Sequence, residues 1–252
     1  MKRFPPTLSP GVLAAERFRV LRYSLGRVDV TAILPVPAHL ADRADTVLSP
    51  VAGESALIRG VRALTEVASV IVAAAPMLAD PVHELLVQQG FSQTRVVTAT
   101  APGDTARCVA AALADDHVTD EILVHDVGWP LVDPDVVARL TAALRGGAQW
   151  VAPARPVTDS IKAVDADGAV VATLDRAELE VMQYPRGFAA DVLRRALSGV
   201  AADRFDDLDV VLSAHARLQL VAGDPHAFGV ELPRDADYLA AVMASRQPDS
   251  AR

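Results

Sequence analysis

The chain has 252 residues, of which 51% are hydrophobic, 4% aromatic and 22% charged, and its formal net charge is −8. This length suits one large α/β domain or two small ones, and the apolar fraction excludes a mainly disordered chain. The acidic balance argues against nucleic-acid binding, because phosphate contacts need clustered lysine and arginine. The single cysteine, Cys108, excludes an intramolecular disulfide framework and a cysteine-based zinc site, and is typical of a reducing cytoplasm.

Residues 1–28 are expected to form a helical appendage to the domain. Ser9-Pro10 is typical of a helix start and Gly26 of a helix stop. Charged residues between Val12 and Leu25 interrupt the apolar stretch, so we expect this segment neither to export the chain nor to span a membrane. Its basic face is interpreted as solvated, with docking to a partner as the alternative.

From Val30 onward, short apolar runs alternate with amphipathic stretches. This alternation predicts a mostly parallel sheet with helices on both faces, in one domain over residues 29–246 followed by a tail at 247–252. The expected strands are Val30–Leu34, Ser69–Ala74, Arg95–Ala99, Glu121–His125, Ala148–Ala152 and Leu218–Ala222. The expected helices are Ser55–Val67, Val82–Gln89, Thr105–Ala114, Pro134–Leu144, Ala189–Leu197, Asp207–Ala216 and Asp235–Ala244.

Residues 158–179 depart from this alternation. Ser160–Val164 and Ala169–Thr173 flank the turn sequence Asp165–Gly168, which predicts a β-hairpin. An isolated two-stranded hairpin is marginally stable in water. We therefore expect an arm that leaves the main body and pairs with a second subunit.

Ligands of open α/β sheets collect beyond the carboxyl ends of the strands, where two loops stand out. Asp126 directly follows an expected strand, and a carboxylate there could hold a divalent cation against substrate phosphates or serve as a turn residue. The loop Pro35–Arg43 follows the first strand, contains two prolines and lies in a stretch without glycine from Gly26 to Gly53. Phosphate cradles need free N–H groups and close backbone approach, so this loop is not expected to be one.

Other catalytic patterns are weak. The run Gly53–Leu57 departs from G-x-S-x-G in its last position, which argues against serine-hydrolase chemistry. The six histidines show no metal-ligand spacing and are interpreted as surface or hydrogen-bonded core residues. Asp206-Asp207 is interpreted as the cap of the helix that follows it rather than as a catalytic pair.

Five motifs in order resemble the methylerythritol-phosphate cytidylyltransferase family. They are Ile122–Asp126 with Pro130–Val132 (family LVHDAARP), Pro156–Val164 (PxxDTIKxV), Leu174–Leu179 (DRxxL), Gln183–Phe188 (QTPQGF) and Val221–Pro225 (VxGDP). The resemblance implies a Rossmann-like nucleotidyltransferase fold and a homodimer joined through hairpin arms. It also implies transfer from CTP to methylerythritol phosphate, a sugar-alcohol phosphate, with Mg²⁺ and release of pyrophosphate, in the non-mevalonate isoprenoid pathway.

Carried over position by position, the resemblance gives six candidate site residues. These are the catalytic Asp126 and Arg176, the substrate-binding Ser160 and Lys162, and the nucleotide-binding Gly103 and Arg107. Asp126 would be the carboxylate on the magnesium side. Arg176, on the arm, would reach the phosphate held by the partner subunit.

The departures from the family pattern fall on the phosphate-binding side. The family's glycine loop PAAGxGxR is replaced by Pro35–Arg43, its two lysines fall at Thr46 and Gly229, and the arginine of HDAARP is replaced by Trp129. Tyr184 also replaces the threonine of QTPQ. The family's nucleotide-side motif GGxxRxx(S/T)V corresponds to Ala101–Val109, where Cys108 replaces the hydroxyl residue. The only lysines of the sequence are Lys2 and Lys162.

Loss of one preorganised charge-stabilising donor typically costs about 10²–10³ in rate. We therefore expect a family member with a preserved scaffold and weak or absent activity. Two alternatives remain. In the first, an active enzyme uses Arg43, Arg107 or an arginine of residues 1–28 as a substitute cation. In the second, a nucleotidyl or glycosyl transferase accepts a different substrate.

Overall fold

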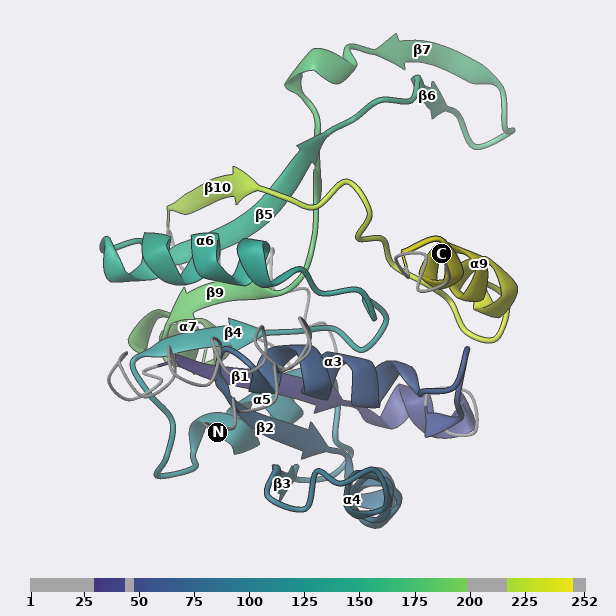
Figure 1. Cartoon of the computed structure of the whole chain (residues 1–252). Helices are drawn as coiled ribbons and strands as arrows, with labels where there is room; N and C mark the ends of the chain where they lie inside the picture. The colour runs from purple at the N-terminus through teal and green to yellow at the C-terminus, as the bar shows by residue number, and fades with distance from the viewer. Residues whose placement is uncertain (1–29, 44–47, 199–216, 247–252) are drawn as a thin grey trace, which may run out of the picture.

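An eight-stranded mixed sheet organises the chain, seen here in a computed structural model that describes residues 30–43, 48–198 and 217–246 (Figure 1). The strand order is β10-β5-β9-β4-β1-β2-β3, with β8 paired to β5. The strands are β1 (Val30–Val36), β2 (Ser69–Ala74), β3 (Arg95–Thr98), β4 (Glu121–Val124), β5 (Trp150–Pro156), β8 (Glu180–Met182), β9 (Arg186–Ala189) and β10 (Leu218–Ala222). All six strands expected from the sequence are present, with their ends shifted by a few residues at most.

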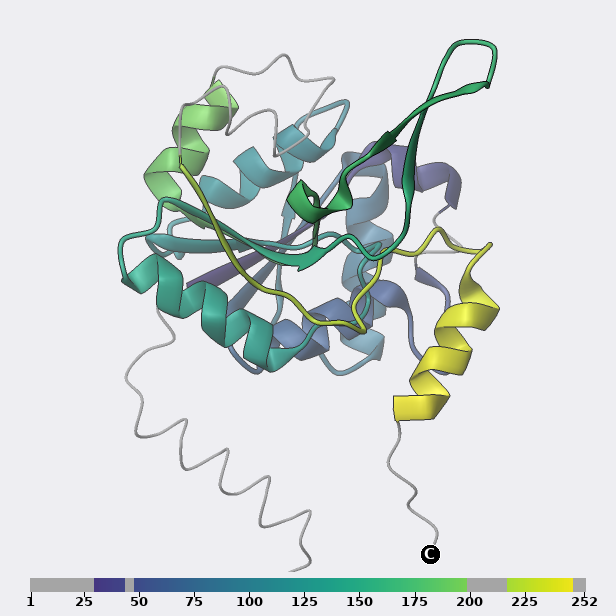
Figure 2. The same ribbon diagram turned by 90° about the horizontal axis from the view of Figure 1, so that it is seen from above.

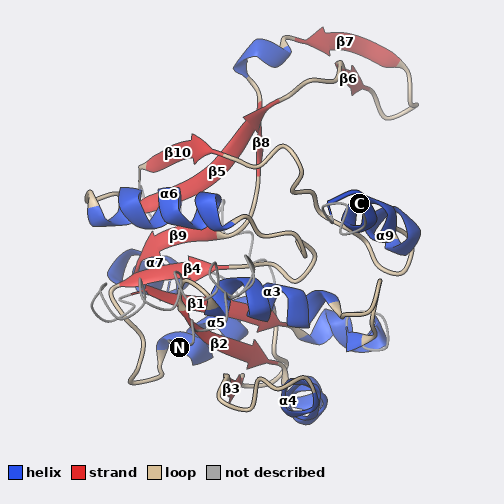
Figure 3. Ribbon diagram, in the orientation of Figure 1, coloured by secondary structure: helices blue, strands red, loops and turns tan. Residues whose placement is uncertain are grey.

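Helices cover both faces of this sheet, as expected (Figures 2 and 3). The α-helices are α3 (Ala56–Thr65), α4 (Ala79–Gln88), α5 (Thr105–Leu113), α6 (Pro134–Arg145), α7 (Ala190–Ser198) and α9 (Ala236–Arg246). Short 3₁₀ turns are η1 (Ala38–Arg43), η2 (Pro76–Leu78) and η3 (Arg176–Glu178). The apolar sides of α3, α4 and α6 pack into one core cluster, and those of α5 and α7 pack into a second.

The two cores explain why the central strands are apolar throughout. Every residue of β1 is buried, because helices lie above and below it. In the second core the rings of Trp150 and Phe188, both fully buried, are stacked with their centroids 6.2 Å apart.

The antiparallel strand β9 was not predicted from the sequence. It lies between β4 and β5 and runs against both, so the mostly parallel sheet contains antiparallel pairs at β8 and β9. β9 is only four residues long and contains Gly187, where an added Cβ would stand 2.6 Å from Val151 Cγ1. A short strand with an obligatory glycine carries little of the apolar pattern from which strands are predicted.

The predicted hairpin arm is confirmed. It consists of β6 (Ile161–Val164) and β7 (Val170–Leu174), which form a separate two-stranded sheet that projects from the body (Figures 1 and 2). Asp165 Oδ1 accepts hydrogen bonds from the N–H groups of Asp167 and Ala169 and so closes the turn.

Several expected elements lie outside the described residues. These are the appendage at 1–28, the tail at 247–252, the helix at 207–216 and its cap at Asp206-Asp207. Within the described part, no helix combines the length and the apolar character that crossing a membrane requires.

Candidate functional site

A cavity of about 610 Å³ lies at the carboxyl ends of β1 and β4. Its wall includes Pro35 and Pro37 after β1, Asp126 and Trp129 after β4, and residues 229–235, which lead into α9. Figure 1 shows α9 on the side of the sheet towards which β1, β2 and β4 point. This is the edge at which open α/β sheets bind their ligands, so we take the cavity as the candidate site.

The loop after β1 offers few amides to an anion. Pro35 and Pro37 have no N–H group. The N–H of Ala38 donates to the carbonyl of Gly103 at 2.8 Å, and the N–H of Leu40 donates to the carbonyl of Pro37 at 3.0 Å. The described part of the loop therefore directs these two donors into the protein.

The two nucleotide-binding candidates, Gly103 and Arg107, do not line the cavity. Gly103 has a φ of +78°, and a Cβ there would stand 2.7 Å from Ala75 Cβ, so glycine is required by packing. Asp104 caps α5 by accepting the N–H of Arg107, and the Arg107 guanidinium is ion-paired with the same carboxylate. The charge of Arg107 is thus neutralised locally.

Asp126 is the sequence-predicted site residue that does line the cavity. Its Oδ1 accepts the N–H of Gly128 at 2.7 Å, which makes it a turn residue as well as an exposed carboxylate. No three His, Cys, Asp or Glu side chains of the described residues are placed to hold a metal ion together. Mg²⁺ is usually bound by one or two carboxylates together with substrate phosphates, so Asp126 alone does not form a protein-made magnesium site.

Trp129 packs against Gly229 in the wall of the cavity. A Cβ added at Gly229 would stand 3.3 Å from both Cε2 and Nε1 of the indole. The N–H of Val230 donates to the carbonyl of Gly128 at 2.8 Å, and this bond holds the two loops together. The indole therefore lies where a longer side chain at position 229 would have to pass.

Two further rings join Trp129 to form an aromatic corner, which we define as Trp129, Tyr184 and His125. The Trp129 and Tyr184 centroids are 6.0 Å apart at an angle of 53°, and those of His125 and Tyr184 are 6.4 Å apart at 81°. All three residues line the cavity. The Arg186 guanidinium lies 4.3 Å from the centre of the Tyr184 ring but does not itself line the cavity.

His125 is buried, with an exposed fraction of 1%, and neither ring nitrogen has a hydrogen-bond partner among the described residues. Burial lowers the pKa of His125 to about 4, against a smaller opposing effect from the backbone of Trp129. The imidazole is therefore neutral at pH 7. His125 is thus a core residue, as one of the two interpretations of the histidines expects, although its ring nitrogens lack a well-aligned partner in the described part of the chain.

Carboxylates outnumber cations around the cavity. Asp126, Glu231 and Asp235 line it, whereas Arg234 is the only arginine or lysine among the described lining residues. Arg234 is bound to Glu231 at 2.9 Å and to Asp235 at 3.0 Å. The hydrogen bond between Arg234 and Asp235 raises the pKa of the arginine and lowers the pKa of the carboxyl group.

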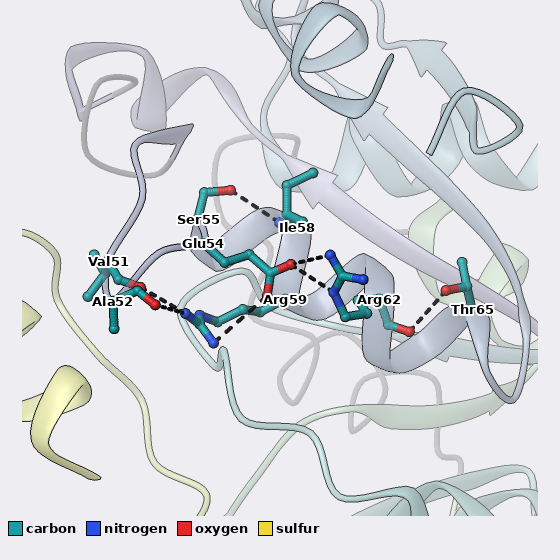
Figure 4. A network of polar contacts seen from close by, with 8 residues as sticks. All are labelled: Val51, Ala52, Glu54, Ser55, Ile58, Arg59, Arg62 and Thr65. Atoms are coloured by element: carbon teal, nitrogen blue, oxygen red, sulfur yellow. Dashed lines mark hydrogen bonds and ion pairs between the residues drawn. The ribbon is translucent and has the colours of Figure 1, made fainter. Parts of the chain in front are cut away.

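The arginines of α3, the helix that follows the first loop, are also engaged (Figure 4). Arg59 donates to the carbonyls of Val51 and Ala52 at 2.8 and 3.2 Å. Arg62 is bound to Glu54 at 2.6 Å, and Arg59 lies 3.8 Å from the same carboxylate. Neither arginine lines the cavity.

Comparison with known proteins identifies the family. The sequence model described as 2-C-methyl-D-erythritol 4-phosphate cytidylyltransferase matches residues 39–245. The chain belongs to this family. It is 35% identical over 224 residues to the enzyme of that name from Saccharopolyspora erythraea, covering 86% of this chain and 100% of the relative. It is 33% identical to the one from Rhodococcus opacus, covering 83% and 93% of the two chains.

A solved structure agrees with this assignment. The crystal structure of the cytidylyltransferase from Thermus thermophilus matches with a TM-score of 0.69 and 26% identity, over 86% of this chain and 99% of that one. The predicted α/β nucleotidyltransferase fold is therefore confirmed.

The three arm residues that the family motifs single out lie away from the cavity. Arg176 donates to the carbonyl of Thr158, Lys162 Nζ donates to Thr173 Oγ1 at 2.8 Å, and Ser160 is exposed. None of the three lines the cavity of its own chain. Glu231, Arg234 and Asp235 were not predicted from the sequence, where the signal was their position at or just before the start of the expected helix Asp235–Ala244.

Proposed function

We propose that this member of the cytidylyltransferase family has kept the scaffold and transfers cytidylyl groups weakly or not at all. The observation that carries the proposal is the lining of the cavity, where, among the described residues, three carboxylates face one arginine that is already ion-paired. Phosphoryl transfer depends on cations and amides that stabilise the charge developing on the phosphates. A triphosphate in this cavity would meet repulsion instead.

Substitute arginines are the main alternative, and the contacts of the described arginines argue against it. Arg107 is paired with Asp104, and Arg62 is paired with Glu54. Arg59 is bound by two backbone carbonyls, and its burial lowers its pKa. The side chain of Arg43 and the arginines of residues 1–28 lie outside the described residues.

We expect the substrates of the family, CTP and methylerythritol phosphate, to bind this chain weakly. CTP and methylerythritol phosphate both need cations to hold their phosphates, and Mg²⁺ could be held by Asp126 only together with those phosphates. The chain's own contribution is one exposed carboxylate in a turn with Gly128.

We further propose that the chain works in the cytoplasm as a homodimer joined through the hairpin arms. The arm exposes Val164, Val170, Val171 and Leu174, with exposed fractions between 46% and 63%. Apolar side chains on a protruding hairpin are typical of a surface that is covered in an assembly. In such a dimer Arg176, Ser160 and Lys162 would approach the cavity of the partner subunit.

Two measurements test the loss of activity. Calorimetric titration with CTP and Mg²⁺ is expected to give no binding heat at millimolar ligand. Pyrophosphate release from CTP and methylerythritol phosphate is expected to be at least about 10²-fold below that of the Saccharopolyspora erythraea relative assayed in parallel. Turnover close to that of the relative, lost on Asp126→Asn, would contradict the proposal.

A further inference from the structure

The aromatic corner and the carboxylates beside it define a ligand class that differs from a nucleotide. We propose that the cavity binds an organic cation, with an alkylammonium or similarly diffuse charge, at the corner of Trp129, Tyr184 and His125. This inference rests on the proposed function, because it takes the cavity to be free of a triphosphate. Three features of the site support it.

The first feature is the arrangement of rings. The Trp129 and Tyr184 rings are tilted by 53° at 6.0 Å, so they form two walls of a corner rather than one stacked surface. Ring faces carry partial negative charge and attract cations within about 6 Å, tryptophan most strongly. A cation whose charge is spread over carbon gains most, since little hydration is lost when it enters such a corner.

The second feature is the excess of negative charge. Among the described residues, Asp126, Glu231 and Asp235 line the cavity and Arg234 is the one lining arginine. These carboxylates still outnumber the described cations when Arg186, whose guanidinium lies 4.3 Å from the Tyr184 ring centre, is counted. Opposite charges attract and like charges repel with energies of about 1–4 kcal/mol at 4 Å near a protein surface. The net charge of −8 on the whole chain acts in the same direction, because it raises the local concentration of cations.

The third feature is His125, which lines the cavity and whose two ring nitrogens have no partner within hydrogen-bond distance and angle among the described residues. The backbone of Trp129 lies close enough to raise the pKa of His125 slightly but does not form a well-aligned bond. Buried polar atoms in native proteins are nearly always hydrogen-bonded to protein, to water or to a ligand, so this imidazole is placed to pair with a polar group that enters the cavity. A neutral imidazole has one N–H donor and one acceptor nitrogen. It would therefore bind a hydroxyl or N–H group attached to the cation.

Other occupants fit these features less well. A divalent metal ion lacks its ligands, since no three suitable side chains of the described residues converge. A phosphorylated ligand would face the carboxylates. A neutral apolar ligand would use the rings but not the charge, and the experiment below separates it from a cation.

Choline and its uncharged carbon analogue 3,3-dimethylbutan-1-ol provide a matched pair of probes, titrated calorimetrically into the full chain. We expect choline to bind and the alcohol to bind at least about tenfold more weakly. Trp129→Leu is expected to weaken choline binding about threefold to thirtyfold, whereas Trp129→Phe retains most of it. Circular dichroism of each variant establishes that it is folded.

Charge variants make the test sensitive to sign. Arg234 is exposed and its ion pairs contribute little to stability, so Arg234→Gln should fold and bind choline severalfold more tightly. Glu231→Gln should bind it severalfold more weakly. Asp167→Asn, which changes an exposed carboxylate in the turn of the distant arm, is the control and should have no effect.

The outcomes separate this inference from the proposed function. Equal binding of both probes, choline binding that ignores Arg234 and Glu231, or no choline binding at all would each overturn the inference. If CTP with Mg²⁺ also fails to bind in those cases, the proposed loss of activity still stands. Tight binding of CTP with Mg²⁺ and efficient turnover would overturn both.

Discussion

The pKa of His125 gives a quantitative prediction about the stability of the site. Burial lowers this pKa from 6.5 to about 4. Above pH 6.5 the histidine is neutral in both the folded and the unfolded chain and does not affect their balance. Between pH 6.5 and about 4 the unfolded chain takes up a proton that the folded chain excludes, so the free energy of unfolding falls as the pH falls.

The magnitude follows from the size of the shift. Each pKa unit corresponds to about 1.4 kcal/mol, so a difference of about 2.5 units removes about 3 kcal/mol of stability by pH 4 and about 2 kcal/mol by pH 5. A small domain has only about 5–15 kcal/mol in total. The effect of this one residue is therefore measurable by urea denaturation at a series of pH values.

His125→Asn removes the titrating group. We expect the unfolding free energy of the variant to fall between pH 7 and pH 5 by about 2 kcal/mol less than that of the parent chain. The slope with pH is compared rather than the stability at one pH, so any cost of the smaller side chain cancels. His83→Asn, at an exposed position on α4, is the matched control.

If the free energies of unfolding of the parent chain and of His125→Asn fall in parallel as the pH falls, the pKa of His125 is not lowered by burial. The prediction is also refuted if NMR titration of the folded chain shows the His125 ring protonating near pH 6.5. Either result would mean that the imidazole is solvated or already paired in the folded state. The unpaired nitrogens could then not be used as evidence for a ligand.

Three further predictions concern packing. Gly229→Lys alone should lower the free energy of unfolding, measured by urea denaturation, by about 1–3 kcal/mol, because the added Cβ would lie 3.3 Å from the Trp129 indole. Combination with Trp129→Arg should relieve this cost, and additive effects of the two changes would contradict the contact. Gly103→Ala should lower the free energy of unfolding by more than about 2 kcal/mol, because its Cβ would meet Ala75. Gly168→Ala, also at positive φ but with no neighbouring atom within 4 Å, should lower it by about 1 kcal/mol. Equal losses would contradict the close approach of Gly103 to Ala75. Burial raises the pKa of the Cys108 thiol to about 12, so iodoacetamide at pH 8 should label this thiol only after the chain unfolds. Mass spectrometry detects the label, and rapid labelling of the folded chain would contradict the prediction.

The sheet and its helices could be predicted because their signals are local. β2 and β10 begin and end where the apolar runs of the sequence do, and Ser55 and Asp133 cap the helices that follow them. β9 escaped because its place between β4 and β5 is decided by partners more than 30 residues away in sequence. Its four residues are too few to show the apolar alternation from which a strand is predicted.

The sequence predicted the edge of the sheet at which the cavity lies, but only some of the residues that line the cavity. Asp126 was found because it follows a strand, and the first loop because it lacks glycine. The pairing of Arg107 with Asp104 was missed, although the i, i+3 spacing at a helix start is a signal that could have found it. Glu231, Arg234 and Asp235 were missed because only the folded chain brings their segment back over the strand ends.

The contact between Trp129 and Gly229 shows what sequence comparison leaves out. The sequence names both positions as departures from the family, but as separate losses that are 100 residues apart. In the structure the hydrogen bond from Val230 to Gly128 holds the two loops together, and the indole lies against the glycine. A side chain at position 229 would require the indole to shift, because its Cβ would lie 3.3 Å from the ring. The side chains that positions 129 and 229 can accept therefore depend on each other. That coupling is why the cost of Gly229→Lys has to be measured both with and without Trp129→Arg.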